Sequence, residues 1–197
     1  MSRPFRLGLT GSIGMGKSTT AQMFVDAGCA LWDADAAVHR LYAPGGAAVA
    51  PLSELHPPAL VDGGISRPAL KAWIDRDPQA LRKIEAVVHP LVAQDREDFA
   101  SKSDARVIVF DIPLLFENGI ERMLDAVAVV SVPGAVQKAR VLARGTMTEQ
   151  QFASILAKQM PDAQKRAKAD FVINSSDLDT ARADVSRILQ TIEAAHA

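Results

Sequence analysis

The sequence lacks the features of disulfide-rich, membrane-spanning and nucleic-acid-binding proteins. Of its 197 residues one is a cysteine, Cys29, which excludes an intrachain disulfide and a multi-cysteine zinc site. Lys and Arg number 22 against 23 Asp and Glu, so there is no basic excess for nucleic acid. Apolar stretches such as Ala126–Val130 fall far short of the roughly 18 residues of a membrane helix. No apolar signal core follows Arg3 and Arg6, so we expect a cytoplasmic protein that binds neither membrane nor nucleic acid.

The composition is that of an ordinary globular chain. Hydrophobic residues make up 48% and charged residues 23%, which excludes intrinsic disorder. A chain of 197 residues has room for one compact domain with a subdomain. We expect a monomer or a small homo-oligomer.

Short apolar segments recur along the chain, and each is followed by turn or polar residues, as in buried parallel strands. Helical patterns lie between them, so the class is α/β with a mostly parallel sheet. The expected strands are Arg6–Leu9, Ala30–Trp32, Val107–Phe110, Val127–Val132 and Phe171–Ile173.

Helix caps and one insertion complete the expected organisation. Ser176 with Asp179, and Thr148 with Gln151, have the spacing of capping boxes. The stretch from about Arg40 to Gln94 holds several prolines and helical patterns but no clear strand. We interpret it as a mainly helical insertion, in which His89-Pro90 ends a helical pattern.

The strongest motif is a phosphate loop. Residues Gly11 to Ser18 fit G-x-x-x-x-G-K-[ST] at every fixed position, between an expected strand and an expected helix. Glycines let backbone N–H groups turn toward phosphates, and the helix N-terminus adds partial positive charge. Lys17 is expected to reach the β and γ phosphates of a nucleotide, and the Ser18 hydroxyl to bind Mg²⁺.

Three carboxylates follow expected strands, where ligands gather in open α/β sheets. Asp111 ends an apolar run, as a metal-approaching carboxylate does, although a strand-end Asp also caps turns. Asp33 and Asp35 follow the second strand. Either one suits a base that accepts a proton from an attacking hydroxyl, and either one equally suits a helix cap.

Two arginines and a histidine are further candidates. Arg140 and Arg144 lie four residues apart, on one helix face suited to clamping a transferring phosphoryl group, although such pairs are also common on solvated faces. Their position suits a lid that excludes water. An isolated histidine such as His89 is more often structural. The basic cluster Lys165, Arg166 and Lys168 is interpreted as a solvated helix face.

Taken in order, these segments resemble the dephospho-CoA kinase family over nearly the whole chain. The Pro-Leu-Leu-Phe-Glu run ending at Glu117 is the most specific segment. The resemblance is carried by Leu9–Thr19, Asp33–Asp35, Val61–Arg67, Val88–Pro90, Asp111–Glu117, Gln137–Arg140, Arg144, Gln159 and Ala169–Ile173.

The resemblance implies a P-loop kinase fold with a five-stranded parallel sheet flanked by helices. It implies ATP-dependent phosphorylation of the ribose 3′-hydroxyl of dephospho-CoA, the last step of coenzyme A synthesis, with Mg²⁺. Residues 1–39, 101–137 and 169–197 would form the core, 40–100 a helical substrate region and 138–168 a lid.

The resemblance also assigns roles to residues. Asp35 would be the base, with Lys17 and Arg140 as further catalytic residues, and Ser18 and Asp111 would hold the metal. Substrate binding falls to Asp33, Asp35, Arg67, His89, Pro90 and Leu114. Nucleotide binding falls to Gly11, Ser12, Ile13, Gly14, Met15, Gly16, Lys17, Ser18, Thr19, Arg144 and Asn174, with adenine contacted mostly by backbone groups.

Two other functions fit less of the sequence. Another small-molecule kinase would share the phosphate loop but should lack the Asp111–Glu117 segment and the helical insertion. A GTP-dependent switch would need an Asn-Lys-x-Asp run for guanine, and the sequence contains none.

Overall fold

A computed structural model describes residues 3–195 of the chain. The chain divides into two compact units. The sheet unit comprises the chain up to Trp32 and from Ser103 onward, and the helical unit runs from Asp33 to Lys102.

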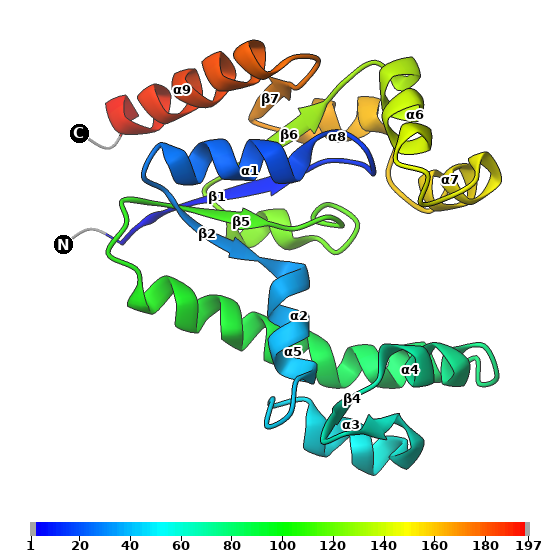
Figure 1. The fold of residues 1–197 in the computed structure, drawn as a ribbon. Helices are drawn as coiled ribbons and strands as arrows, with labels where there is room; N and C mark the ends of the chain where they lie inside the picture. The colour runs from blue at the N-terminus through cyan, green and yellow to red at the C-terminus, as the bar shows by residue number, and fades with distance from the viewer. Residues whose placement is uncertain (1–2, 196–197) are drawn as a thin grey trace. The chain divides into compact units, whose positions relative to one another are not determined.

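The sheet unit is built on a parallel sheet of five strands in the order β2-β5-β1-β6-β7 (Figure 1). This confirms the expected fold class, and each expected strand is present to within one residue at either end. The apolar runs at 107–111 and 126–131 are buried along their whole length, as in strands that are covered on both faces of a parallel sheet. The strands are β1 Phe5–Thr10, β2 Ala30–Asp33, β5 Val107–Asp111, β6 Ala126–Ser131 and β7 Phe171–Asn174.

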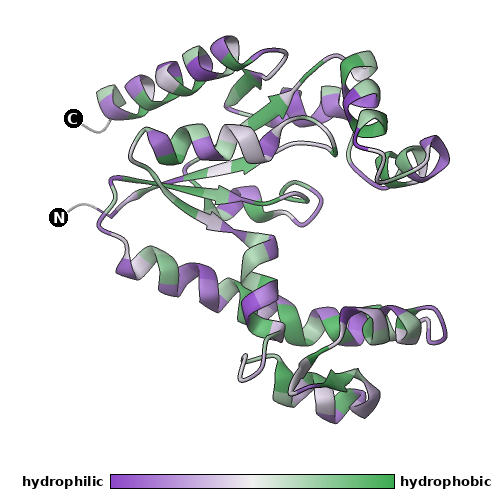
Figure 2. Ribbon diagram, viewed as in Figure 1, coloured by the Kyte–Doolittle hydropathy of each residue, from purple (hydrophilic) through white to green (hydrophobic). Residues whose placement is uncertain are grey.

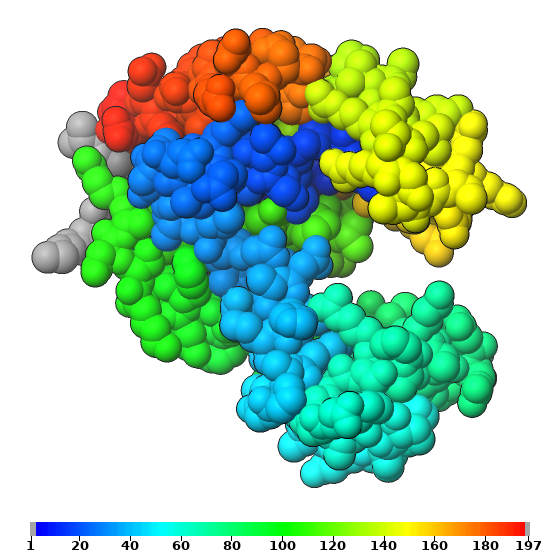
Figure 3. Space-filling view, in the orientation of Figure 1, coloured from blue at the N-terminus to red at the C-terminus, as the bar shows by residue number. Residues whose placement is uncertain are grey.

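Helices α1 and α9 pack together on the sheet (Figures 1 and 3). Phe24 of α1 and Ile188 of α9 are almost fully buried in one cluster with Leu7 and Leu9 of β1. In Figure 2, α9 alternates between apolar and hydrophilic residues, as a helix with one buried face does. Each buried side chain of this size contributes roughly 1.5–3 kcal/mol to folding. The helical segments of this unit are α1 Lys17–Asp26, η2 Ile120–Met123, α6 Gly134–Ala143, α7 Glu149–Leu156, α8 Asp162–Lys168 and α9 Leu178–Ala195.

The helical unit is mainly helical, as expected, but it also contains a two-stranded hairpin where no strand was expected. Asp62 and Gly63 have φ of 49° and 77°, which is the left-handed geometry of a tight hairpin turn. Its segments are α2 Ala34–Tyr42, α3 Val49–Leu55, η1 Pro57–Ala59, β3 Leu60–Val61, β4 Gly64–Ile65, α4 Arg67–Ile74 and α5 Ala80–Lys102.

Helix α5 corrects a second expectation. The helical pattern was expected to end at His89-Pro90, but α5 continues through Pro90 to Lys102. Proline removes one backbone donor and kinks a helix, yet it does not end one whose flanking turns are packed. Here Val88 and Ala100 are buried on either side of Pro90, so packing outweighs the lost hydrogen bond.

The two expected capping boxes have different outcomes. Thr148 and Gln151 form the expected box at the start of α7. At α9 the cap is Asp177 instead of Ser176, because its Oδ1 accepts from the backbone N–H of Thr180 at 2.8 Å. The backbone and side-chain hydrogen bonds from Thr180 lower the pKa of Asp177. The carboxylate of Asp177 therefore caps α9 in place of the Ser176 hydroxyl that the sequence predicted.

Asp125 attaches the start of the chain to the loop before β6. Its carboxylate accepts from Arg3 Nη1 at 2.9 Å, from Arg3 Nη2 at 2.6 Å and from the Arg6 backbone N–H at 2.8 Å. Partial burial by itself raises the pKa of Asp125, but the hydrogen bonds from Arg3 and Arg6 outweigh it, and the net pKa lies below the ordinary 3.8. The ionised form is therefore the one that stabilises the fold.

We predict that Asp125→Asn lowers the midpoint of thermal unfolding by roughly 2–4 °C at pH 7. Because the folded pKa is lowered, this stabilisation is present above pH 3.8 and is lost as the pH falls further. The difference between variant and wild type should therefore shrink below pH 4 in urea unfolding curves. Asp104→Asn is the control, since Asp104 is exposed. An equal difference at all pH values would contradict the prediction.

Candidate nucleotide-binding site

The phosphate loop lies between β1 and α1, where the sequence predicted it. Gly14 and Gly16 have φ of 78° and 89°, a left-handed backbone that glycine adopts without strain. Within residues 3–195, no group accepts a hydrogen bond from the backbone N–H of Gly14, Gly16, Lys17 or Ser18. Unpaired amides at the start of a ten-residue helix form a site for an anion.

Lys17 and Asp111 form an ion pair within this site. Register places Asp111 of β5 beside Leu9 of β1, so the carboxylate lies next to the start of the loop. Lys17 Nζ donates to Asp111 Oδ1, and only 3% of the Asp111 side chain is exposed. The ion pair therefore places the positive charge of Lys17 next to a potential metal ligand, Asp111, at the carboxyl end of the sheet.

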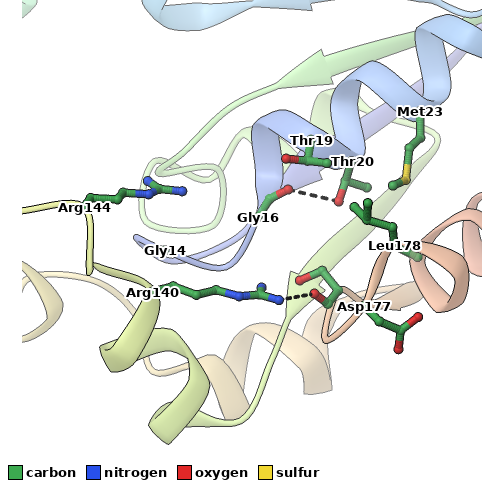
Figure 4. Close-up of a pocket in the computed structure, with 11 residues that line it drawn as sticks. Gly14, Gly16, Thr19, Thr20, Met23, Arg140, Arg144, Asp177 and Leu178 are labelled. Atoms are coloured by element: carbon green, nitrogen blue, oxygen red, sulfur yellow. Dashed lines mark hydrogen bonds between the residues drawn. The ribbon is translucent and has the colours of Figure 1, made fainter. Parts of the chain in front are cut away.

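A pocket beside the loop contains both predicted arginines (Figure 4). Arg140 Nη2 donates to the backbone oxygens of Ser175 at 2.8 Å and Ser176 at 3.0 Å. The predicted pair thus lines one cavity with the glycine loop. The pocket is lined by Gly14, Gly16, Thr19, Thr20, Met23, Arg140, Arg144, Ser175, Asp177, Leu178 and Ala181.

The loop after β7 supplies a residue that sequence reasoning missed. Ser175 is buried, and its Oγ donates to the backbone oxygen of Met15 at 2.5 Å, which fastens the phosphate loop. The candidate Asn174 does not line the pocket; its Oδ1 instead accepts from the backbone N–H of Ser176 at 3.0 Å and from its Oγ at 2.7 Å. Nothing in a serine after a strand signals such a contact, because it depends on packing between distant segments.

Glu117 links the segment after β5 to α8. Its Oε1 accepts from the Met160 backbone N–H at 2.8 Å and lies 2.9 Å from Lys165 Nζ. Burial by itself raises the pKa of Glu117, but the hydrogen bonds from Met160 and Lys165 outweigh it and the net pKa is lowered. The Lys165 side chain is 0% exposed, so the expectation of a solvated basic face was wrong for this residue.

The other two members of the basic cluster, Arg166 and Lys168, are exposed, as expected, and each lies near one side chain of the same unit. Arg166 Nε lies 4.0 Å from Asp162 Oδ2, and Lys168 Nζ lies 5.8 Å from the centre of the Phe116 ring. Leu114, a predicted substrate contact in the Asp111–Glu117 segment, is 40% exposed.

The remaining predicted residues lie in the helical unit. Asp33 caps α2, since its Oδ1 accepts from the Ala36 backbone N–H at 2.6 Å, and Asp35 lies in the first turn of the same helix. The Arg67 guanidinium lies 5.9 Å from the centre of the Tyr42 ring. His89 and Pro90 are exposed on α5.

A parallel sheet with a glycine loop, a lysine and a strand-end carboxylate is the arrangement of a P-loop protein. The family model for dephospho-CoA kinase matches residues 5–180. A dephospho-CoA kinase of Ruegeria pomeroyi is 66% identical over 190 residues, covering 96% of each chain. One of Cereibacter sphaeroides is 56% identical, also with 96% of each chain covered. The chain therefore belongs to the dephospho-CoA kinase family.

Solved structures share the fold. A crystal structure of a Thermus thermophilus protein is similar at a TM-score of 0.84 and 32% identity, covering 100% of both chains. A dephospho-CoA kinase of Campylobacter jejuni aligns at a TM-score of 0.65 and 21% identity over 97% of this chain and 98% of that one. A shikimate kinase of Bacteroides thetaiotaomicron, at 0.52 and 12% over 96% and 98%, shares the fold alone.

Gly14 allows a direct test of the loop's packing. A Cβ at Gly14 would overlap Val141 Cγ2 and lie 3.3 Å from the Gln137 backbone oxygen. Gly28 has a similar φ of +90° but nothing within 4 Å of its position for a Cβ. We predict that Gly28→Ala costs about 1 kcal/mol through backbone strain. Gly14→Ala should cost a further 1–3 kcal/mol, roughly, through overlap with α6.

Urea unfolding of the two variants measures the difference. Nucleotide affinity should fall for Gly14→Ala and stay unchanged for Gly28→Ala. Equal losses of stability in both variants would show that the contact with Val141 does not constrain the loop.

Proposed function

We propose that the protein transfers the γ-phosphoryl group of ATP to the ribose 3′-hydroxyl of dephospho-CoA, giving coenzyme A and ADP, the last step of coenzyme A synthesis. The observation that carries the proposal is the phosphate loop with its unpaired amides, in a chain that belongs to the dephospho-CoA kinase family. Phosphoryl transfer depends mainly on positioning and on stabilising charge, and this site supplies both.

The positive groups of the sheet unit surround the place where phosphate charge would develop. The loop from Gly11 to Thr19 binds the nucleotide's phosphates, and Lys17 moves from Asp111 to the β and γ oxygens. Arg140 and Arg144 line the adjoining pocket, where their guanidinium groups stabilise the transferring group. Asn174 acts on the nucleotide indirectly, by shaping the 174–177 turn that borders the pocket.

The residues present also fit Mg²⁺. Ser18 and Asp111 offer hard oxygen ligands at the carboxyl end of the sheet. Within residues 3–195, no cluster of three or more His, Cys, Asp or Glu side chains could hold a metal. Mg²⁺ is usually held by one or two protein ligands together with phosphates and water. When bound, Mg²⁺ neutralises charge on the β and γ oxygens.

Asp35 is the residue we assign as base, because an ionised carboxylate can accept the proton of the attacking hydroxyl. It lies in the first turn of α2, directly after the carboxyl end of β2. Asp33 fixes the start of that helix. Arg67, His89, Pro90 and Leu114 remain the proposed substrate contacts, residues 40–100 the substrate region and 138–168 the lid.

The first test is ADP release from ATP and Mg²⁺ with and without dephospho-CoA, with the product identified by mass. We predict strong stimulation and a product heavier by one phosphate. ATP turnover that ignores dephospho-CoA would retain nucleotide binding and overturn the substrate assignment.

We predict that Asp35→Asn lowers kcat by about 10²–10⁴-fold, because the base is lost, while the Kd for ATP stays within about twofold. Asp33→Asn should be much milder, since asparagine caps a helix as well as aspartate does. Asp75→Asn, at an exposed position of the same unit, is the control. Near-normal turnover of Asp35→Asn would show that another group accepts the proton.

A further inference from the structure

Two glutamine side chains hold a single residue of the phosphate loop, Ile13, from opposite sides. Gln137 Nε2 donates to the Ile13 backbone oxygen at 2.7 Å, and the Ile13 backbone N–H donates to Gln159 Oε1 at 3.1 Å. Gln137 belongs to α6, and Gln159 follows α7. Neither glutamine lines the pocket or has a role in the function proposed above.

The contact of Gln137 determines the direction of a neighbouring amide. In a trans peptide the C=O of one residue and the N–H of the next point in opposite directions. Fixing the Ile13 carbonyl against Gln137 therefore turns the Gly14 N–H the other way. That amide is one of those without an acceptor among the described residues, so it is available to an anion.

The contact of Gln159 has the complementary effect on the preceding peptide. The Ser12 carbonyl accepts from the Met15 backbone N–H at 3.2 Å, and the N–H of the same peptide unit donates to Gln159. Both polar groups of that unit are thus paired, and the unit is fixed next to the one that Gln137 orients. Two successive peptide units of the loop therefore depend on side chains outside it.

Both glutamines are themselves held in place. Gln137 is 4% exposed, and its own backbone oxygen lies close to Gly14. Gln159 donates its backbone N–H to Leu156 O at 3.1 Å, and the next residue, Met160, is bonded to Glu117 at 2.8 Å. Glu117 in turn pairs with the buried Lys165. Groups fixed in this way can impose an orientation on a glycine-containing loop, which has little preference of its own.

We propose that Gln137 and Gln159 are positioning residues for the phosphoryl-transfer reaction, which orient the Ser12–Ile13 and Ile13–Gly14 peptide units so that the loop's free amides face the phosphates. The inference rests on the proposed nucleotide binding. Without the Gln137 contact the Ile13 carbonyl is free to turn toward the anion, and the loop then presents an acceptor where it needs a donor.

The test uses Gln137→Met and Gln159→Met, which keep the side-chain length and remove the hydrogen bond. Gln150→Met, on the exposed surface of α7, is the matched control.

Binding of inorganic tripolyphosphate is measured by calorimetry, and binding of adenosine by competition with a fluorescent nucleotide. We expect tripolyphosphate affinity to fall about tenfold in both variants, because one charge-assisted hydrogen bond is misdirected, and adenosine affinity to stay within twofold. In turnover, kcat should fall more than KM rises for ATP.

A further substitution separates the loss of the hydrogen-bond donor from a change in the shape of the side chain. Gln137→Glu keeps the shape of the side chain but, when ionised, cannot donate to the Ile13 carbonyl. Its tripolyphosphate affinity should therefore be as low as that of Gln137→Met.

Tripolyphosphate affinity equal to that of Gln150→Met in both methionine variants would overturn the proposal. An equal loss for adenosine and tripolyphosphate would also overturn it, since that shows general damage to the pocket. Should Gln137→Met fail to fold, Gln159→Met decides the question alone. Normal polyphosphate binding without coenzyme A formation would contradict the proposed function and leave this inference standing.

Discussion

The constraint on which the sheet unit depends is a set of backbone amides that must stay unpaired. Buried or half-buried N–H groups are almost always hydrogen-bonded. In the part of the chain that the structure describes, those of Gly14 and Gly16 have no acceptor, so the surroundings of the loop must hold it open. Ser175 bonds the Met15 carbonyl, and Gln137 bonds the Ile13 carbonyl. These two acceptors of the loop are thus occupied by the fold, and within residues 3–195 the N–H groups of Gly14 and Gly16 have no acceptor and remain for an anion.

The ion pair between Lys17 and Asp111 solves a related problem of charge. Asp111 is 2% exposed, and an unpaired carboxylate there would be costly, so the ammonium group of Lys17 neutralises it. Strand register brings the two together, because β5 lies beside β1 and Asp111 beside Leu9. Under the proposed function, Lys17 exchanges Asp111 for the phosphates when the nucleotide binds, and Asp111 exchanges Lys17 for Mg²⁺. Neither charge is then left unpaired.

Much of the sheet unit could be predicted from sequence because its signals are local. Five apolar runs with polar ends gave the strands, and the spacing of glycines with Lys17 gave the phosphate loop. The errors lie where tertiary contacts override local patterns. Helix α5 continues through Pro90 because the turns on either side are packed. Asp177, and not Ser176, caps α9. Lys165 is buried because it pairs with Glu117. These partners are distant in sequence or compete with equally good neighbours, and composition alone cannot rank them.

Arg140 illustrates why the residue type matters as much as the charge. One nitrogen, Nη2, donates to two backbone carbonyls of the loop after β7, which fixes the plane of the guanidinium. The other, Nη1, lies 3.7 Å from the place where a Cβ on Gly16 would be, so it faces the phosphate loop. A lysine has a single point charge and cannot both anchor itself to carbonyls and present a second donor in a fixed direction. The fold therefore sets the orientation of the guanidinium in advance. Under the proposed function, its positive charge stabilises the transferring phosphoryl group without reorganising, which is what catalysis by preorganised charge requires.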